Sequence, residues 1–315
     1  MVGCNKSDQN ENVVSKRYIH KYGYDVSKND WDLAEFPGQV VTTLRNGTTI
    51  TASYEDGVLH GQTTHTYPHS QTIESLLTYE KGQLVKKQSY NIRGIPEKEE
   101  TYLSPTHLKE VKWYSSGVPM SVEEFHITEL LNGEYYNINN EILCKVTKGF
   151  GERLVRDQHE KISAKETLEH GYAIKKETFH PHGIPHTIIS LSGGKMHGEK
   201  KVFAATGEPI SIEFYANNLL DGLATYYQNG CRFLEVNYKE GKKHGSECHF
   251  VDGETLVEKT EWLENQKHGP STVYFDGMSK SQWYFNNVLV TKEKYRELCL
   301  QTENIAIMSE RARRG

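Results

Sequence analysis

The sequence predicts an all-β fold: a repetitive array of stacked β-hairpins in one elongated, twisted sheet, with a short N-terminal cap and a C-terminal α-helix. Three observations support this prediction. Aromatic residues end strand-length segments at steps of 22 to 24 residues, a second aromatic series keeps nearly the same step, and so do glycines in the expected turns. Three independent series that share one period are the signature of a repeat protein.

The first aromatic series closes the first strand of each unit. One longer step of 43 residues separates Tyr136 from Phe179. Equivalent side chains of stacked hairpins form a ladder with a spacing of about 4.8 Å per strand. Such a ladder either packs the array together or presents a binding surface, and the sequence leaves both interpretations open. Its members are Tyr67, Tyr90, Tyr114, Tyr136, Phe179, Phe203, Tyr227, Phe250 and Tyr274.

The stretch from Tyr238 to Trp262 shows one unit most clearly. Glu240-Gly241 and Asp252-Gly253 each pair an acidic residue with a glycine, which supplies the positive φ of a tight hairpin turn. We expect Trp262 to stack between Tyr238 and Tyr284 of the neighbouring units. A His-Gly pair recurs in five units, and we expect its histidine to bond a neighbouring carbonyl or to pack on the next ring. These histidines are His60, His170, His197, His244 and His268.

The pattern Tyr-x-x-Gly-x-x-His-Gly-x-x-x-x-aromatic-x-x-Gly resembles the MORN repeat. It is most similar to the variant repeat of the bacterial proteins called YwqK-type antitoxin components. The likeness extends from about Thr51 to Phe285, although the units around Val85 and Lys109 lack the His-Gly pair. The resemblance implies an array of stacked hairpins with an interaction role. It supplies no catalytic residues.

Taken in order, the chain begins with a polar segment, residues 1–17, that we interpret as a disordered tether. Residues 18–50 are expected to form an N-terminal cap. Ser27 is a suitable N-cap for a short helix, and Asn46-Gly47 is a strong hairpin signal. A first block of MORN-like repeats is expected at 51–142.

The second half of the chain repeats the pattern after an interruption. Residues 143–169 break the period and are interpreted as an irregular, degenerate unit. A second repeat block is expected at 170–290, followed at 291–315 by a capping helix and a basic tail. A helix there would cover the last open edge of the array. Its apolar stripe has helical spacing and comprises Tyr295, Leu298, Cys299, Thr302, Ile305 and Ala306.

Composition narrows the possible functions. The hydrophobic content of 36% and the mean hydropathy of −0.69 suit a thin sheet, and 19 tyrosines supply rings with a polar edge. A net charge of −5 argues against a nucleic-acid partner, because proteins that follow a phosphate backbone are basic. The sequence contains no apolar run long enough to span a membrane.

The five cysteines form no Cys-x-x-Cys pair, and most are expected to be buried free thiols. Cys4 differs from the other cysteines. It follows Val2-Gly3 and precedes a polar stretch, which is similar to the end of a bacterial lipoprotein signal. The charged and apolar regions that precede such a cysteine are missing. Two interpretations remain: a lipidated Cys4, or an incidental cysteine in a disordered segment.

Fifteen histidines raise the question of a metal site. His180, His182 and His186 lie around one expected turn, with His170 nearby. Zinc requires three or four converging ligands. Because His180 to Gly183 occupies a turn position of the repeat, we interpret these side chains as solvated and expect no metal and no cofactor.

Enzyme motifs are absent from the sequence: it has no phosphate-binding loop, no His-Glu-x-x-His and no Gly-x-Ser-x-Gly elbow. Adjacent carboxylates, Glu99-Glu100 and Glu123-Glu124, are expected to point to opposite faces of a strand. A hydrolase acting on a polymer would need two converging carboxylates, which the sequence does not show. We therefore expect a protein without enzymatic activity.

Together these features predict a non-catalytic interaction scaffold that presents its sheet to a protein, peptide or glycan partner. If Cys4 is lipidated, we expect the protein at a bacterial cell envelope as a lipoprotein, or exported from the cell. The alternative, implied by the family resemblance, is a cytoplasmic antitoxin that neutralises a toxin by direct binding. Lipidation of Cys4 would distinguish the two, because an envelope protein could not restrain a cytoplasmic toxin.

Overall fold

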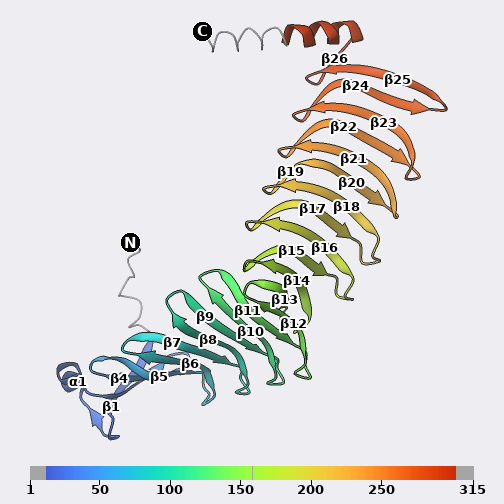
Figure 1. Cartoon of the computed structure of the whole chain (residues 1–315). Coiled ribbons are helices and arrows are strands. Elements are labelled where there is room, and N and C mark those ends of the chain that lie inside the picture. The colour runs from blue at the N-terminus through green and yellow to red at the C-terminus, as the bar shows by residue number, and fades with distance from the viewer. Residues whose placement is uncertain (1–11, 158, 303–315) are drawn as a thin grey trace. The chain divides into compact units, whose positions relative to one another are not determined.

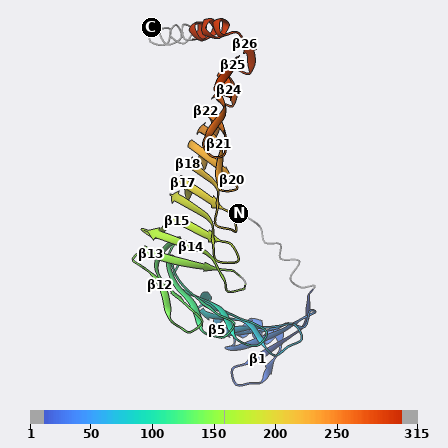
Figure 2. The same cartoon turned by 90° about the vertical axis from the view of Figure 1, so that its right-hand side faces the viewer.

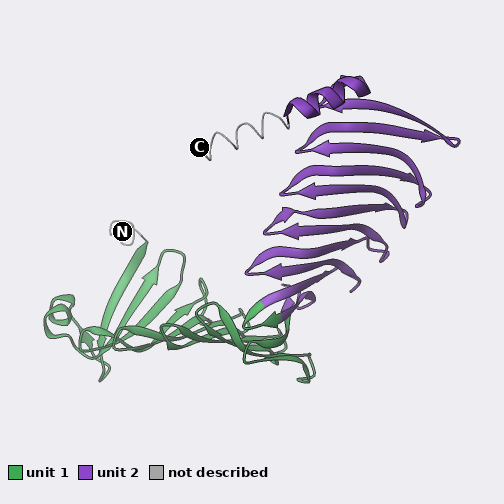
Figure 3. Cartoon of the chain, turned by 45° about the horizontal axis from the view of Figure 1, so that its top comes forward, with its two compact units in different colours: residues 1–153, 168–172 green, residues 154–167, 173–315 purple. Residues whose placement is uncertain are grey.

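A computed structural model of the chain describes residues 12–157 and 159–302 (Figure 1). Of the residues, 67% lie in strands and 6% in helices. The strands form one open antiparallel sheet of 26 strands. The predicted all-β array of hairpins with a C-terminal helix is confirmed. The chain divides into two compact units (Figure 3): Met1–Arg153 with Leu168–Tyr172, and Leu154–Thr167 with Ala173–Gly315.

Among its described residues, the first unit contains one helix, α1 (Lys28–Ala34), and the N-terminal strands. Each strand from β3 onward pairs with its neighbours in sequence. The strands are β1 (Val13–His20), β2 (Asp25–Val26), β3 (Gly38–Leu44), β4 (Thr49–Glu55), β5 (Val58–Thr66), β6 (Ile73–Glu80), β7 (Gln83–Tyr90), β8 (Pro96–Ser104), β9 (His107–Trp113), β10 (Pro119–His126), β11 (Glu129–Tyr136) and β12 (Ile142–Thr147).

Two strands are shared between the units, β13 (Phe150–Arg156) and β14 (Ile162–Glu169). The second unit continues with the same antiparallel pairing. Its strands are β15 (Tyr172–Phe179), β16 (Pro185–Ser192), β17 (Lys195–Phe203), β18 (Pro209–Ala216), β19 (Leu219–Leu220), β20 (Gly222–Gln228), β21 (Cys231–Lys239), β22 (Lys242–Val251), β23 (Thr255–Leu263), β24 (Gln266–Phe275), β25 (Met278–Phe285) and β26 (Val288–Val290). A helix at 292–302 follows.

The N-terminal cap contains the expected helix and hairpin. The Ser27 hydroxyl accepts a hydrogen bond from the Asp30 amide at 3.2 Å, and Trp31 of α1 is buried against Tyr18 and Tyr54. The predicted tether at 1–17 is wrong for its last residues. Residues 13–17 lie in β1, which pairs with β3 from Val13 to His20. This polar segment is ordered because it pairs with β3. Composition, on which the prediction of a tether rested, gives no information about a partner strand elsewhere in the chain.

The turns of successive hairpins are joined by hydrogen bonds. At several turns whose last residue is glycine, the glycine amide donates to a carbonyl of the preceding hairpin, as Gly241 does to Leu220 at 2.7 Å. Where this residue is asparagine, a second bond is added. The Asn265 amide donates to the Lys243 carbonyl, and the Asn265 side chain accepts from the Lys243 amide at 2.7 Å. These bonds join one repeat to the next.

The stretch 143–169 is built of strands and is not irregular, which corrects the sequence interpretation. Its turn after Arg156 matches the turn after Tyr136: the Asp157 side chain accepts from the His159 and Lys161 amides, as the Asn137 side chain accepts from Asn139 and Glu141. Arg156 therefore occupies an aromatic position of the repeat. The period was lost from the sequence because an arginine replaces the ring and because β12 and β13 are short.

Side chains alternate between two faces of the sheet, and most buried residues share one of them. We call this the buried face and the opposite one the open face. The buried residues of this face are mainly small or polar, so a single layer buries little volume. They include Thr63, Ser121, Glu123 and Tyr135 in the first unit, and Ser211, Glu213, Ala224, Val236, Thr260 and Ser271 in the second.

The helix at 292–302 packs on the last hairpin through one ring. Tyr295 contacts Trp283 and His268, with ring centroids 5.1 and 5.4 Å apart, and Thr291 caps the helix by accepting from the Lys294 amide. Burial, and then the Cys299 thiol, raise the pKa of Tyr295 to about 12. Of the predicted stripe, Ile305 and Ala306 lie outside the described residues, as does the basic tail.

Candidate functional site

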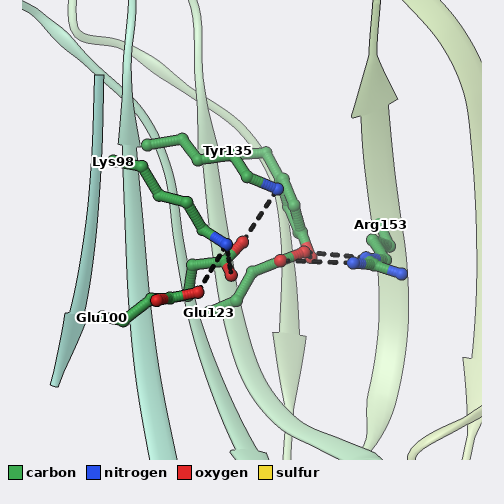
Figure 4. Close-up of polar contacts among 7 residues, drawn as sticks. Lys98, Glu100, Glu123, Tyr135 and Arg153 are labelled. Atoms are coloured by element: carbon green, nitrogen blue, oxygen red, sulfur yellow. Dashed lines mark hydrogen bonds and ion pairs between the residues drawn. The ribbon is translucent and has the colours of Figure 1, made fainter. Parts of the chain in front are cut away.

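A charged cluster lies on the buried face of the first unit (Figure 4). It spans strands β8 to β13. Three acids and three bases make it electrically balanced, and a tyrosine completes it. We call it the charged cluster; it comprises Lys98, Glu100, Glu110, Lys112, Glu123, Tyr135 and Arg153.

Glu123 is the centre of one half of the charged cluster. Its side chain is 3% exposed, and it accepts bonds from Arg153 Nε at 2.7 Å and from Arg153 Nη2 at 3.2 Å. The Tyr135 hydroxyl donates to the same carboxylate at 2.7 Å. Burial, and then the Glu123 carboxylate, raise the pKa of Tyr135 far above its usual value. The arrangement ties β10 to β11 and β13 through a buried ion pair.

Lysines bridge the carboxylates in the other half of the charged cluster. Lys98 Nζ lies 2.7 Å from both Glu100 and Glu110, and Lys112 Nζ lies 2.8 Å from Glu110. Burial opposes ionisation of Glu110, but the bonds from Lys112 and Lys98 outweigh it and hold the pKa of Glu110 below its usual value. The bonds from Glu100 and Glu110 likewise overcome burial and raise the pKa of Lys98.

Sequence reasoning missed this convergence of carboxylates. Glu100, Glu110 and Glu123 are direct neighbours on β8, β9 and β10, because register pairs Glu100 with Glu110 and Glu110 with Glu123. Only the register brings them together. Adjacent acids were expected to point to opposite faces of a strand, and this is correct for Glu123 and Glu124. Glu123 is buried, whereas Glu124 is half-exposed and bonds His107 at 2.8 Å and Asn132 at 2.7 Å.

The open face of the first unit carries a hollow of about 490 Å³ over β8 to β12. Charged side chains of both signs ring it: Lys109, Glu124, Glu134 and Lys145. Lys145 donates to Glu134 at 2.9 Å. The Tyr136 hydroxyl and then Lys145 lower the pKa of Glu134, and the Asn132 amide leads the groups that lower the pKa of Glu124.

The predicted aromatic ladder lies at or near the ends of alternate strands. Tyr114 is buried, Tyr274 is exposed, and the other seven members are half-buried. Two hydroxyls bond the backbone of a later member: Tyr67 donates to the Tyr90 carbonyl at 2.7 Å and Tyr114 to the Tyr136 carbonyl at 2.6 Å. These bonds join one repeat to the next. Whether the ladder also binds a partner stays a prediction.

Trp262 packs against lysines and not against the rings of neighbouring units. Among the described residues no ring contact links Trp262 to Tyr238 or Tyr284, so that expectation is wrong. Instead, Lys243 Nζ lies 4.7 Å from the Trp262 ring, and Lys267 Nζ lies 5.9 Å from the Trp262 ring and 5.3 Å from Tyr284. Long cationic side chains cover the rings while their charge stays near water.

Two of the repeat histidines, His60 and His268, and His180 of a later turn have structural contacts. His60 accepts from the Lys81 amide at 3.3 Å, and His268 bonds the Asn286 side chain at 2.9 Å and packs on Phe285. His180 Nε2 lies 2.9 Å from the Phe203 carbonyl, and its ring contacts His186. Within the described residues, no group of three or more His, Cys, Asp or Glu side chains is placed to hold a metal ion.

The two histidines of one turn are expected to differ in their contribution to stability. His180→Ala should lower the free energy of unfolding of the second unit by about 1 kcal/mol, the usual value of one hydrogen bond. His182 is exposed, so His182→Ala should change the free energy of unfolding by less than about 0.5 kcal/mol. Urea unfolding of the two variants measures both values, and equal losses would contradict the assignment.

Comparisons with known proteins identify no family. No protein-family model matches the chain, and no curated protein matches it. A structure of an S. aureus TarM mutant in complex with Fondaparinux, alpha-GlcNAc-glycerol and UDP shares 10% identity over 39% of this chain, with a TM-score of 0.20. The chain spans only 21% of TarM. BamB from Moraxella catarrhalis shares 9% identity over 78% of this chain and 82% of its own, with a TM-score of 0.15.

Cys4 lies outside the described residues, so its lipidation stays a prediction. The described part of the chain contains no helix with the length and apolar character needed to cross a membrane.

Proposed function

We propose that this chain is a non-catalytic interaction scaffold that binds a protein, peptide or glycan through its sheet surface. The hollow on the open face of the first unit supports the proposal most directly. There, Lys109, Glu124, Glu134 and Lys145 surround one depression, and both acids are held by neighbouring side chains. Charges that are already positioned lose less conformational entropy when a partner binds.

The lowered pKa values of three carboxyl groups favour a binding role over a hydrolytic one. Glycoside hydrolysis by two carboxyl groups requires one of them to be protonated at working pH. The pKa of Glu124 and of Glu134 is lowered by hydrogen-bond donors, and the pKa of Glu110 in the charged cluster is lowered by two lysines. None of these three groups is suited to act as a general acid near neutral pH.

The partner that fits this hollow has charged or hydroxyl groups of its own. Two cations and two anions line the depression, and Val122 and Leu103 add apolar surface to its lining. Electrostatic complementarity of this kind determines which partner binds more than how tightly it binds. The envelope location would follow from lipidation of Cys4 and belongs to the same proposal.

Site-specific photocrosslinking tests the proposal. A photoreactive amino acid at Thr147, an exposed residue that lines the hollow, should capture a partner in cells of the source organism. The same amino acid at Leu33, which is 83% exposed on α1, is the control. The adduct should disappear when Lys109→Glu and Lys145→Glu are combined with the Thr147 probe. The proposal fails if Thr147 gives no adduct, or if Leu33 gives the same adduct.

A further inference from the structure

The last full strand of the sheet, β25, is paired along only part of its outer side. Its inner side pairs with β24 at every residue from Met278 to Tyr284. Its outer side pairs with β26 only at Trp283, Tyr284 and Phe285, because β26 has three residues. Within residues 12–157 and 159–302, no strand pairs with the outer side of residues 278–282. We call this segment the open edge.

Solvent exposure shows the same division of β25. The five residues of the open edge are all exposed, and the three residues that follow are half-buried. The helix at 292–302 packs through Tyr295 on Trp283 and Phe285, at the other end of the strand. In Figures 1 and 3 the helix lies over that end of β25, and the part next to the turn with β24 extends beyond it.

The register determines which backbone groups face outward. Two-residue turns with positive φ, at Asp276-Gly277 and Asn286-Asn287, close both flanking hairpins. The residues that flank such a turn form a hydrogen-bonded pair, and hydrogen-bonded pairs alternate along an antiparallel ladder. Met278 therefore points its amide toward β24 and Phe285 points its amide toward β26. By alternation, the N–H and C=O groups of Ser279 and Ser281 point into the open edge.

We propose that the open edge binds an extended peptide segment of a partner, which adds to the sheet as an antiparallel strand and carries a carboxylate opposite Lys280. Backbone groups of Ser279 and Ser281 would form hydrogen bonds with the added strand. That strand would lie in line with β26, beyond the point where β26 ends and the chain enters the helix. Strand addition of this kind takes its affinity from main-chain hydrogen bonds and its specificity from alternate side chains.

Charge selects an acidic peptide over a second copy of this chain. If the open edges of two copies paired antiparallel about their midpoint, Lys280 would lie opposite Lys280, and like charges directly opposite each other are destabilising. At the other end of the sheet, β1 carries Lys16, whose charge has the same sign as that of Lys280. An acid opposite Lys280 instead forms a favourable cross-strand pair.

Matched variants on one strand test the proposal. Ser281→Pro removes the outward N–H and leaves the ladder to β24 intact, as proline is tolerated on edge strands whose N–H faces solvent. Ser281→Ala keeps the N–H and is the control. Lys280→Glu reverses the charge. The probe is a fluorescein-labelled peptide of alternating threonine and valine with one central glutamate, and a second peptide carries lysine instead.

Fluorescence anisotropy should show that the full chain binds the glutamate peptide more tightly than the lysine peptide. Loss of one main-chain bond in Ser281→Pro should weaken binding about fivefold or more, and Ser281→Ala should have no effect. Lys280→Glu should reverse the preference between the peptides. Hydrogen exchange of residues 278–282 should slow when the glutamate peptide is bound.

Three results would each overturn the proposal: equal binding of both peptides by the wild-type chain, equal affinity of Ser281→Pro and Ser281→Ala, or unchanged exchange in the open edge. Self-association that Ser281→Pro abolishes would assign the edge to a second copy and would also overturn it. The open edge lies in the second unit and the hollow in the first, so either proposal can fail while the other stands.

Discussion

Replacement of Glu123 by alanine should destabilise the first unit by about 3 kcal/mol or more, the usual cost of removing one partner of a buried ion pair. In this variant the Glu123 carboxylate no longer accepts from the Arg153 guanidinium, and the Tyr135 hydroxyl, on a side chain that is 1% exposed, loses the acceptor that Glu123 provided. A buried donor without a partner carries its own desolvation penalty. The effect should appear as faster amide exchange across β10 to β13.

The neighbouring acid is the matched control. Glu124 lies on the same strand but faces the open side, where its side chain is 31% exposed. Glu124→Ala should change the free energy of unfolding by about 1 kcal/mol or less, as exposed ion pairs do. Urea unfolding of both variants decides between the assignments. A loss at Glu124 as large as that at Glu123 would contradict the division into a buried and an open face.

The second large effect is expected at Gly149, where two turns of the first unit meet. Its φ is +82°, and a Cβ added there would lie 2.5 Å from the backbone nitrogen of Gly171. Gly149 also donates to Leu131 and accepts from Gly171. Gly149→Ala therefore combines backbone strain with overlap that no side-chain rotation relieves. Overpacking of this kind costs about 1–3 kcal/mol or more.

A matched substitution at Gly94 separates the backbone strain from the steric overlap in Gly149→Ala. The φ of Gly94 is +77°, close to that of Gly149, but nothing lies within 4 Å of an added Cβ. Gly94→Ala should cost about 1–2 kcal/mol, from the left-handed backbone alone. Thermal or urea unfolding should therefore show a clearly larger loss for Gly149→Ala. If the two losses are equal, the turns of the two hairpins do not pack as closely as described.

Much of the fold was predictable from the sequence because its signals are local. Turn glycines, strand-end aromatics and Ser27 act within a few residues of their own position, so their spacing predicted hairpins and the short helix. The two predictions that failed depend on distant partners. Residues 13–17 form a strand because they pair with β3, and the stretch 143–169 keeps the repeat although Arg156 stands where other repeats have a ring.

The candidate sites depended on information that the sequence does not contain. Alternation along a strand determined that Glu123 and Glu124 point to opposite faces, and this was predictable. Register between strands decided that Glu100, Glu110 and Glu123 lie side by side. A one-residue shift in pairing would move every side chain of a strand to the other face, so spacing alone cannot place neighbours across a sheet.

The sequence by itself determined the repeat, the hairpins and the helix that follows them, since period and turn chemistry are written along the chain. Only the tertiary structure decided which charges converge, that lysines and not rings cover Trp262, and where the sheet stops being paired. These features arise between strands, through register and through the three-residue length of β26. Contacts between segments that are distant in sequence leave no local sequence pattern, so they could not be predicted from the sequence.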